Sequence, residues 1–145
     1  MPKCWLITFV ALVAVSCSER PVGAVVADTP RTEWTTEESA EMCYTNCDTL
    51  SLHNLAVVAR CEAAHAKELL PLRVEVQSPS GVCYAGKVVL TPSARHTGGS
   101  FVELSADWIE DARFLELGDY HFWIAPCQPA KGVWSVGVRM DRIEN

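Results

Sequence analysis

The hydrophobic period of the chain changes at Pro71, and this change limits the possible folds more than any other feature. Residues 72–77 (LRVEVQ) alternate apolar and polar side chains, which is the period of a strand with one buried face. Residues 78–81 (SPSG) then have the composition of a tight turn. Similar segments follow between stretches that carry Gly and Pro: 82–90, 100–104, 113–117, 120–125 and 133–140. Short strands at this spacing predict an antiparallel β-sandwich over residues 72–140.

Before Pro71 the apolar residues recur with the period of a helix instead. Thr35 and Glu38 have the spacing of a capping box, whose side chains bond to free amides at a helix start. One helical face would contain Ala40, Cys43, Tyr44 and Cys47. A second face would contain Leu52, Leu55, Ala56, Ala59, Ala63, Ala66 and Leu70, and Pro71 would end that helix. We therefore expect residues 36–70 to form a helical hairpin that packs on the sandwich, so that 36–145 is a single α+β domain.

Two later segments alternate in a way that is typical of a sandwich. Residues 118–124 (GDYHFWI) and 132–136 (GVWSV) resemble the last strands of immunoglobulin-like extracellular domains. The resemblance implies an immunoglobulin-like architecture, and it implies no activity, because many unrelated functions occur on such sandwiches. Residues 105–112 (SADWIEDA) are expected to form a helical turn at the sandwich edge.

Residues 1–18 have the composition of a secretory signal peptide. Lys3 precedes an apolar run over residues 5–15, which at about 11 residues is too short for a bilayer span of roughly 20. Residues 13–17 (VAVSC) resemble the lipobox of bacterial lipoproteins, with Ala14 in place of the usual leucine, and this resemblance implies lipidation of Cys17. The alternative is ordinary cleavage after Ser16 or Ser18, or near residues 25–27. The protein is thus expected to be extracytoplasmic, either secreted or anchored to the cell envelope, with a linker over 19–35.

The charge balance excludes some partners. The chain has 18 acidic against 12 basic side chains, and removal of the signal peptide would remove only Lys3 from this count. This excess argues against nucleic acid as a partner, because neutralising phosphates requires a basic surface. It also argues against polybasic attachment to anionic lipid, so contact with a membrane is expected only through a lipid on Cys17.

Export to an oxidising compartment predicts that the cysteines form disulfides. Residues four apart on a helix have Cβ atoms about 5–6 Å apart, wider than the roughly 3.5–4.5 Å of a disulfide. Cys43 and Cys47 should therefore have different partners. We expect Cys47 to bond to Cys61 across the helical turn. Cys43 would then pair with Cys83 or Cys127, or those two would pair with each other and leave Cys43 free.

An alternative hypothesis is a metal-binding or redox-linked protein. Three thiolates and one imidazole form an accepted structural set for zinc, and the sequence offers Cys43, Cys47, Cys61 and His65. The spacing lacks the C-x₂-C of a tight zinc knuckle. A count of free thiols in the unreduced protein would separate this hypothesis from disulfides.

The sequence predicts a binding protein rather than an enzyme. It contains no nucleophile elbow, zinc-protease helix or glycine-rich phosphate loop, and no cofactor is expected. If Tyr120, Phe122 and Ile124 fill the core, the alternate residues of that strand point outward and form an aromatic patch, which can mark a binding surface. The candidates for such a surface are Trp108, His121, Trp123 and Trp134. The expected partner is a protein, a glycan or another envelope component.

Overall fold

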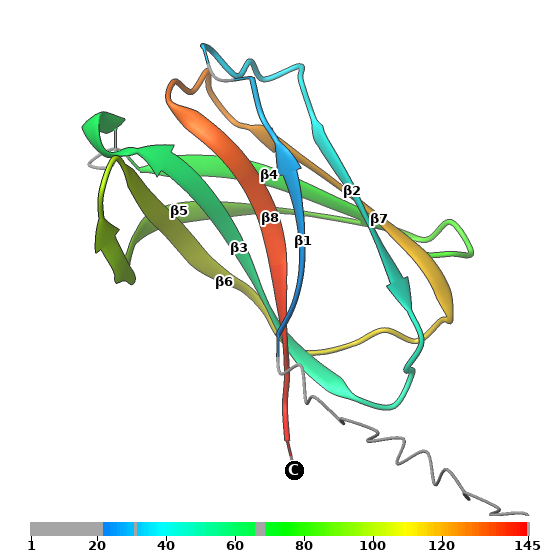
Figure 1. Ribbon diagram of the computed structural model, residues 1–145. Helices are drawn as coiled ribbons and strands as arrows, with labels where there is room; N and C mark the ends of the chain where they lie inside the picture. Colours follow the sequence, from blue (N-terminus) through cyan, green and yellow to red (C-terminus); the bar gives the residue numbers. More distant parts are fainter. Residues whose placement is uncertain (1–21, 31, 66–68, 145) are drawn as a thin grey trace, which may run out of the picture.

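The computed structural model describes residues 22–30, 32–65 and 69–144, and almost all of this chain is antiparallel β-structure (Figure 1). The strands are β1 (Val22–Asp28), β2 (Ala40–Asn46), β3 (Leu52–Glu62), β4 (Leu70–Gln77), β5 (Cys83–Gly98), β6 (Phe101–Arg113), β7 (Gly118–Pro126) and β8 (Val133–Arg142). A 3-10 helix, η1 (Ala63–His65), follows β3, and the described residues contain no α-helix.

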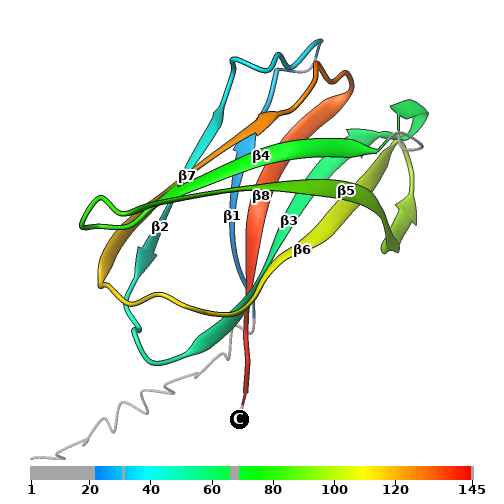
Figure 2. The same ribbon diagram turned by 180° about the vertical axis from the view of Figure 1, so that it is seen from behind.

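All eight strands belong to one nearly closed, barrel-like sheet with the order β1-β8-β3-β6-β5-β4-β7-β2. The sheet curls until its edge strands β1 and β2 contact each other. It thereby forms two layers, with β1, β8, β3 and β6 in one and β5, β4, β7 and β2 in the other (Figures 1 and 2). Consecutive strands β4, β5 and β6 are neighbours, while β3 lies beside β6 and β7 lies beside β4. Two overlapping Greek keys in eight strands are the topology of a jelly roll.

The core lies between the two layers. β5 connects the layers, because residues 83–90 pair with β4 and residues from Thr91 onward pair with β6. Trp34, which precedes β2, is fully buried, and its indole N–H donates to the carbonyl of Glu38 at 2.7 Å. The other large, fully buried side chains come from strands of both layers: Val57, Leu72, Val74, Leu90, Leu104, Phe122, Ile124, Val136 and Val138.

The helical hairpin predicted over 36–70 is wrong, because β2 and β3 occupy this segment. In β2 the residues Glu41, Cys43 and Thr45 are exposed, and the residues between them face the core. In β3 the alternate residues from His53 to Cys61 are all buried, and the strand pairs with β6 on one side and β8 on the other. Small alanine and cysteine side chains fit a helical period and a strand period equally well, and the long-range pairing selects the strand.

The contact predicted as a helix cap closes a turn. The Glu38 carboxylate accepts hydrogen bonds from the amide and the hydroxyl of Thr35, at 3.2 and 3.1 Å. The amide of Glu38 in turn donates to the carbonyl of Thr35 at 3.2 Å. One bond of a capping box, from the Thr35 amide to the Glu38 carboxylate, is therefore present without a helix, whereas the Glu38 amide bonds to the backbone carbonyl of Thr35 and not to its hydroxyl.

The predicted immunoglobulin-like sandwich is also wrong, because the strand order is that of a jelly roll. The expected strand at 113–117 is largely the connection between β6 and β7, and the expected helical turn at 105–112 lies within β6. Residues 22–28, which fall within the expected linker, form β1 and pair with β8.

The predicted disulfides are wrong, since all five cysteines in the described part of the chain are free: Cys43, Cys47, Cys61, Cys83 and Cys127. Cys47 lies just before the start of β3 and Cys61 lies near its end, so the length of the strand, roughly 30 Å, separates them. Cys43 on β2 and Cys83 on β5 have β7 and β4 between them, which places the two strands roughly 14 Å apart.

The signal peptide predicted over residues 1–18, including Cys17, lies outside the described residues. Within residues 22–30, 32–65 and 69–144, no helix is long and apolar enough to cross a membrane.

Candidate binding face

β7 has one face in the core and one face outside. Tyr120, Phe122 and Ile124 point inward, with exposed fractions of 7%, 1% and 0%. His121 is exposed and Trp123 is half-buried. The two residues of the expected aromatic patch therefore lie together on the outside of the β5-β4-β7-β2 layer.

The register of the neighbouring strands places polar side chains around these two rings. Trp123 pairs with Glu41 of β2 on one side and with Glu75 of β4 on the other. His121 pairs with Cys43 and with Gln77 in the next row. We define the β7 outer face as the set Glu41, Arg73, Glu75, Gln77, His121 and Trp123.

Contacts within the β7 outer face fix the position of its aromatic rings. The indole N–H of Trp123 donates to the Glu41 carboxylate. The rings of His121 and Trp123 are stacked, with centroids 6.0 Å apart and planes 26° apart. The Nε of Arg73 lies 3.5 Å from a carboxylate oxygen of Glu75, and both side chains are about half exposed. The face thus presents a held aromatic pair beside charged groups that solvent can reach.

Shallow hollows lie on both sides of the stacked rings. One hollow of about 290 Å³ is lined by Ser39, Arg73, Glu75, Gln77, Cys83, Trp123 and Ala125. Another of about 470 Å³ lies beyond His121 and is lined by Gln77, residues 78–81, Asp119 and His121. Both are near the lower end of the 300–1,000 Å³ typical of ligand pockets, and they are open. The geometry suits a ligand that lies along the surface.

The other two aromatic candidates lie elsewhere. Trp108 of β6 is half-buried and packs against the core, edge to face with Phe122 at a centroid distance of 6.5 Å. Trp134 of β8 packs edge to face on Phe101 at 4.4 Å, and its indole N–H donates to Glu62 at 3.2 Å. The four candidates therefore do not share one surface.

The alternative metal ligands are not brought together. Cys43 lies on the outer face of β2 and Cys47 follows that strand, whereas Cys61 and His65 lie at the opposite end of β3. Burial raises the pKa of Cys61 to about 11, so this thiol remains protonated. Among the described residues, no group of three or more His, Cys, Asp or Glu side chains could hold a metal ion.

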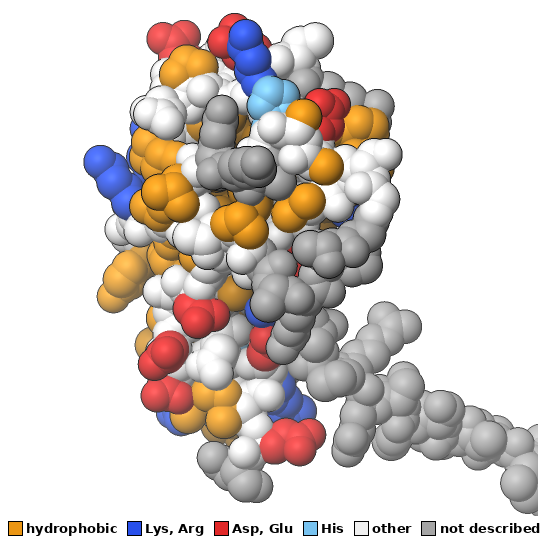
Figure 3. All heavy atoms as spheres, turned by 90° about the vertical axis from the view of Figure 1, so that its left-hand side faces the viewer, with side chains coloured by type: hydrophobic (Ala, Val, Ile, Leu, Met, Phe, Trp, Pro, Cys, Tyr) orange, Lys and Arg blue, Asp and Glu red, His pale blue; other side chains and the backbone are white. Residues whose placement is uncertain are grey.

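The molecular surface agrees with an acidic protein. The face seen in Figure 3 mixes apolar, acidic and basic side chains. The formal net charge of the whole chain is −6.

The sequence indicated only part of the β7 outer face. The alternation of residues 72–77 already placed Arg73, Glu75 and Gln77 on one face of a strand, but no signal joined that strand to β7. Glu41 was missed because its segment was interpreted as a helix. Neither a scan against models of protein families nor a search of curated proteins finds a match to this chain.

Proposed function

We propose that this protein is a non-enzymatic extracytoplasmic binding protein, secreted or lipid-anchored, whose β7 outer face binds a glycan. The observation that carries the proposal is the stacked His121–Trp123 pair, held by Glu41 and flanked by charged and amide side chains. A sugar ring has an apolar C–H face that packs on an aromatic ring, and its hydroxyl groups pair with carboxylates, amides and guanidinium groups. The β7 outer face offers both kinds of group next to each other.

A glycan suits this face better than a protein does. Stable protein interfaces bury well over about 1,000 Å² and contain an apolar centre. The central rows of the β7 outer face carry polar and charged side chains around the two rings, and the large exposed aliphatic side chains of the described residues lie on other parts of the molecule. The hollows beside the rings are open, as a chain of sugars requires.

Binding of purified protein to an oligosaccharide array, followed by calorimetry on the best binder, tests the proposal. We expect Trp123→Ala and His121→Ala each to weaken binding at least tenfold. Tyr84→Ala is the matched control, because Tyr84 is an exposed aromatic residue of β5 outside the β7 outer face. Absence of any oligosaccharide ligand, or binding that Trp123→Ala leaves unchanged, would refute the glycan proposal.

The extracytoplasmic location has an independent test. Intact mass of the protein from its native host reports the cleavage site and any lipid on Cys17. A chain that retains residues 1–18 would contradict export, whatever the array shows.

A further inference from the structure

Five of the eight large exposed apolar side chains of the described residues lie at or near one end of the jelly roll, and the other three are Val26, Leu69 and Val89. Leu50, Leu115 and Leu117 are 81%, 74% and 65% exposed, and they lie on the connections from β2 to β3 and from β6 to β7. Val82 and Tyr84, near the β4–β5 turn, are 59% and 69% exposed. Single exposed leucines are common on protein surfaces, whereas several on adjoining loops indicate a contact surface.

These loops touch each other. The side-chain amide of Asn46 donates to the carbonyls of Phe114 and Glu116, at 3.3 and 2.9 Å. Gly118 lies against Pro79 of the β4–β5 turn, where an added Cβ would be 3.3 Å from the proline ring. The connections 47–51 and 114–117 therefore form one surface, which we call the leucine end, and the β4–β5 turn adjoins it.

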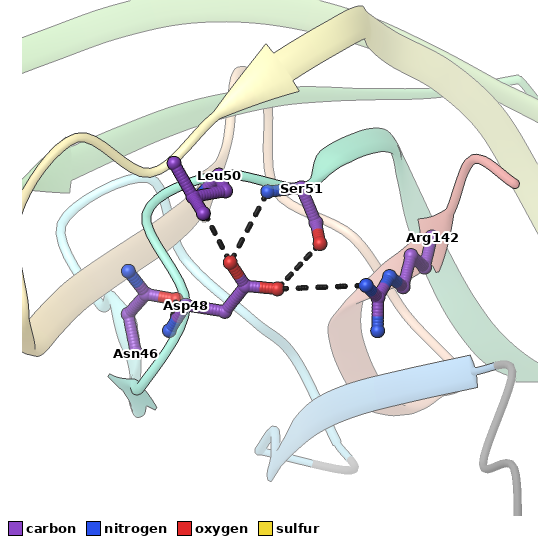
Figure 4. Close-up of polar contacts among 5 residues, drawn as sticks. All are labelled: Asn46, Asp48, Leu50, Ser51 and Arg142. Atoms are coloured by element: carbon purple, nitrogen blue, oxygen red, sulfur yellow. Dashed lines mark hydrogen bonds and ion pairs between the residues drawn. The ribbon is translucent and has the colours of Figure 1, made fainter. Parts of the chain in front are cut away.

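Hydrogen bonds hold the backbone that carries Leu50. The Asp48 carboxylate accepts from the amides of Leu50 and Ser51, at 2.8 and 3.2 Å, and from the Ser51 hydroxyl (Figure 4). Arg142 approaches the same carboxylate at 3.8 Å. These hydrogen bonds, foremost that of the Ser51 hydroxyl, lower the pKa of Asp48 to about 2. The turn therefore keeps Leu50 projecting into solvent.

The described chain also begins at the leucine end. Val22 of β1 pairs with Asp141, and the next residue of β8, Arg142, pairs with His53 at the start of β3 (Figure 1). Only five residue steps separate Cys17 from Val22, and they span at most about 18 Å when fully extended. A lipid on Cys17 would therefore bring this end, and not the opposite one, to the bilayer.

We propose that the leucine end lies on the lipid bilayer, with Leu50, Leu115 and Leu117 in the interfacial region. The inference rests on the proposed anchorage at Cys17. The carboxylates of this end already have local partners, since Asp48 has the contacts above and hydrogen bonds from Ser78 and Ser80 lower the pKa of Glu116. Apolar side chains lie among acidic and basic ones at the lower end of the view in Figure 3. The contact is therefore apolar and does not require anionic lipid.

Tryptophan quenching in reconstituted vesicles tests the orientation. Full-length lipidated protein carrying Leu50→Trp or Leu117→Trp is placed in phosphatidylcholine vesicles with brominated acyl chains. We expect its emission to fall at least twofold more than that of wild type. Leu69→Trp is the control, because Leu69 is 60% exposed and precedes β4 at the opposite end. Equal quenching at Leu69 and Leu50, or no added quenching at Leu50, would overturn the proposal.

The intact-mass measurement tests the lipid on Cys17 independently of the contact between the leucine end and the bilayer. If Cys17 carries no lipid, the anchorage fails, and the leucine end is tested by co-sedimentation of the purified chain with phosphatidylcholine vesicles. A triple variant carries Leu50→Ser, Leu115→Ser and Leu117→Ser. The bilayer contact is still supported if vesicle binding falls at least tenfold in this triple variant and is unchanged in Leu69→Ser. No vesicle binding, or a dimer that the triple variant dissociates, overturns it.

Discussion

The two faces of β7 have opposite roles in the molecule. Its inner residues, such as Phe122 and Ile124, are among the most deeply buried side chains, whereas on the outer face the rings of His121 and Trp123 stack and Trp123 bonds to Glu41. A single run of alternating residues thus supplies core packing on one face and the proposed binding surface on the other. Changes on one face should affect stability, and changes on the other should affect binding.

The largest expected effect comes from the inner face. Phe122→Ala removes a fully buried ring and should lower the free energy of unfolding by about 3–5 kcal/mol. Trp123→Ala should lower it by about 1 kcal/mol or less, because this side chain packs on one side only. Urea unfolding followed by circular dichroism measures both. If Phe122→Ala does not fold, Phe122→Leu should still cost more than Trp123→Ala, and the reverse order would refute the comparison.

Thiol reactivity compares inner and outer positions in a second way. Burial raises the pKa of Cys61 from an ordinary 9.0 to about 11, which lowers its thiolate fraction by about 100-fold. Cys43 and Cys83 are exposed on the outer face of their layer. Alkylation of native protein followed by peptide mapping should label these two at least 100-fold faster than Cys61. Equal labelling rates would show that the end of β3 opens readily.

A buried polar residue should give an intermediate effect. Asn46 is 2% exposed and bonds to two carbonyls of the β6–β7 connection, so Asn46→Ala should cost about 1–3 kcal/mol. Thr45→Ala is the control, because the bond from Thr45 to Asp119 is exposed. Urea unfolding should show little change for that variant. A similar loss in both would mean that the position of Asn46 in the core is unimportant.

The smallest expected effect is a dependence of stability on pH. His53 is 8% exposed, lies edge to face with Phe114, and its Nδ1 has no hydrogen-bond partner in the described structure. Burial lowers the pKa of His53 below its ordinary 6.5, while Asp48 opposes this shift and Arg142 adds to it. As the pH falls, the unfolded chain therefore binds a proton at this residue before the folded chain does. The contribution of neutral His53 to the free energy of unfolding is complete above pH 6.5, and it is lost as the pH falls toward the folded-state pKa.

Urea midpoints at pH 7.5 and 5.5 measure this loss. The midpoint should decrease at the lower pH in wild type and decrease less in His53→Gln. His121→Gln, on the outer face, should keep the wild-type decrease. An unchanged decrease in His53→Gln would assign the pH dependence to other groups.

The sequence predicts the strands after Pro71 better than those before it. The alternation in 72–77 and 120–125 is carried by large side chains, and these segments lie within β4 and β7. β2 and β3 were misinterpreted because alanine and cysteine give a weak period, and because the core of β3 includes His53, a polar residue type. β1 has no clear pattern of its own, and the residues that pair with it lie more than 100 positions further along the chain. Strand order depends on such distant pairings, so the jelly roll could not be derived from local patterns.

The candidate site was only partly predictable, because local alternation places residues within one strand but does not show which strands are neighbours. Alternation within one strand placed His121 and Trp123 on a common face. Their neighbours Glu41 and Glu75 come from strands far away in sequence, and only the register between β2, β7 and β4 brings them together. The predicted disulfides are wrong because they were inferred from the expected cellular compartment. The compartment says nothing about the distances between the cysteines.

The pairing of the first strand with the last has a consequence for biogenesis. In the described part of the chain, the only strand hydrogen-bonded to β1 is β8, whose paired residues lie more than 100 positions further along the chain. β1 therefore cannot pair until β8 has been synthesised, and this delays closure of the sheet. For an exported chain, which must cross a narrow translocation channel unfolded, this strand order would delay closure until β8 has passed.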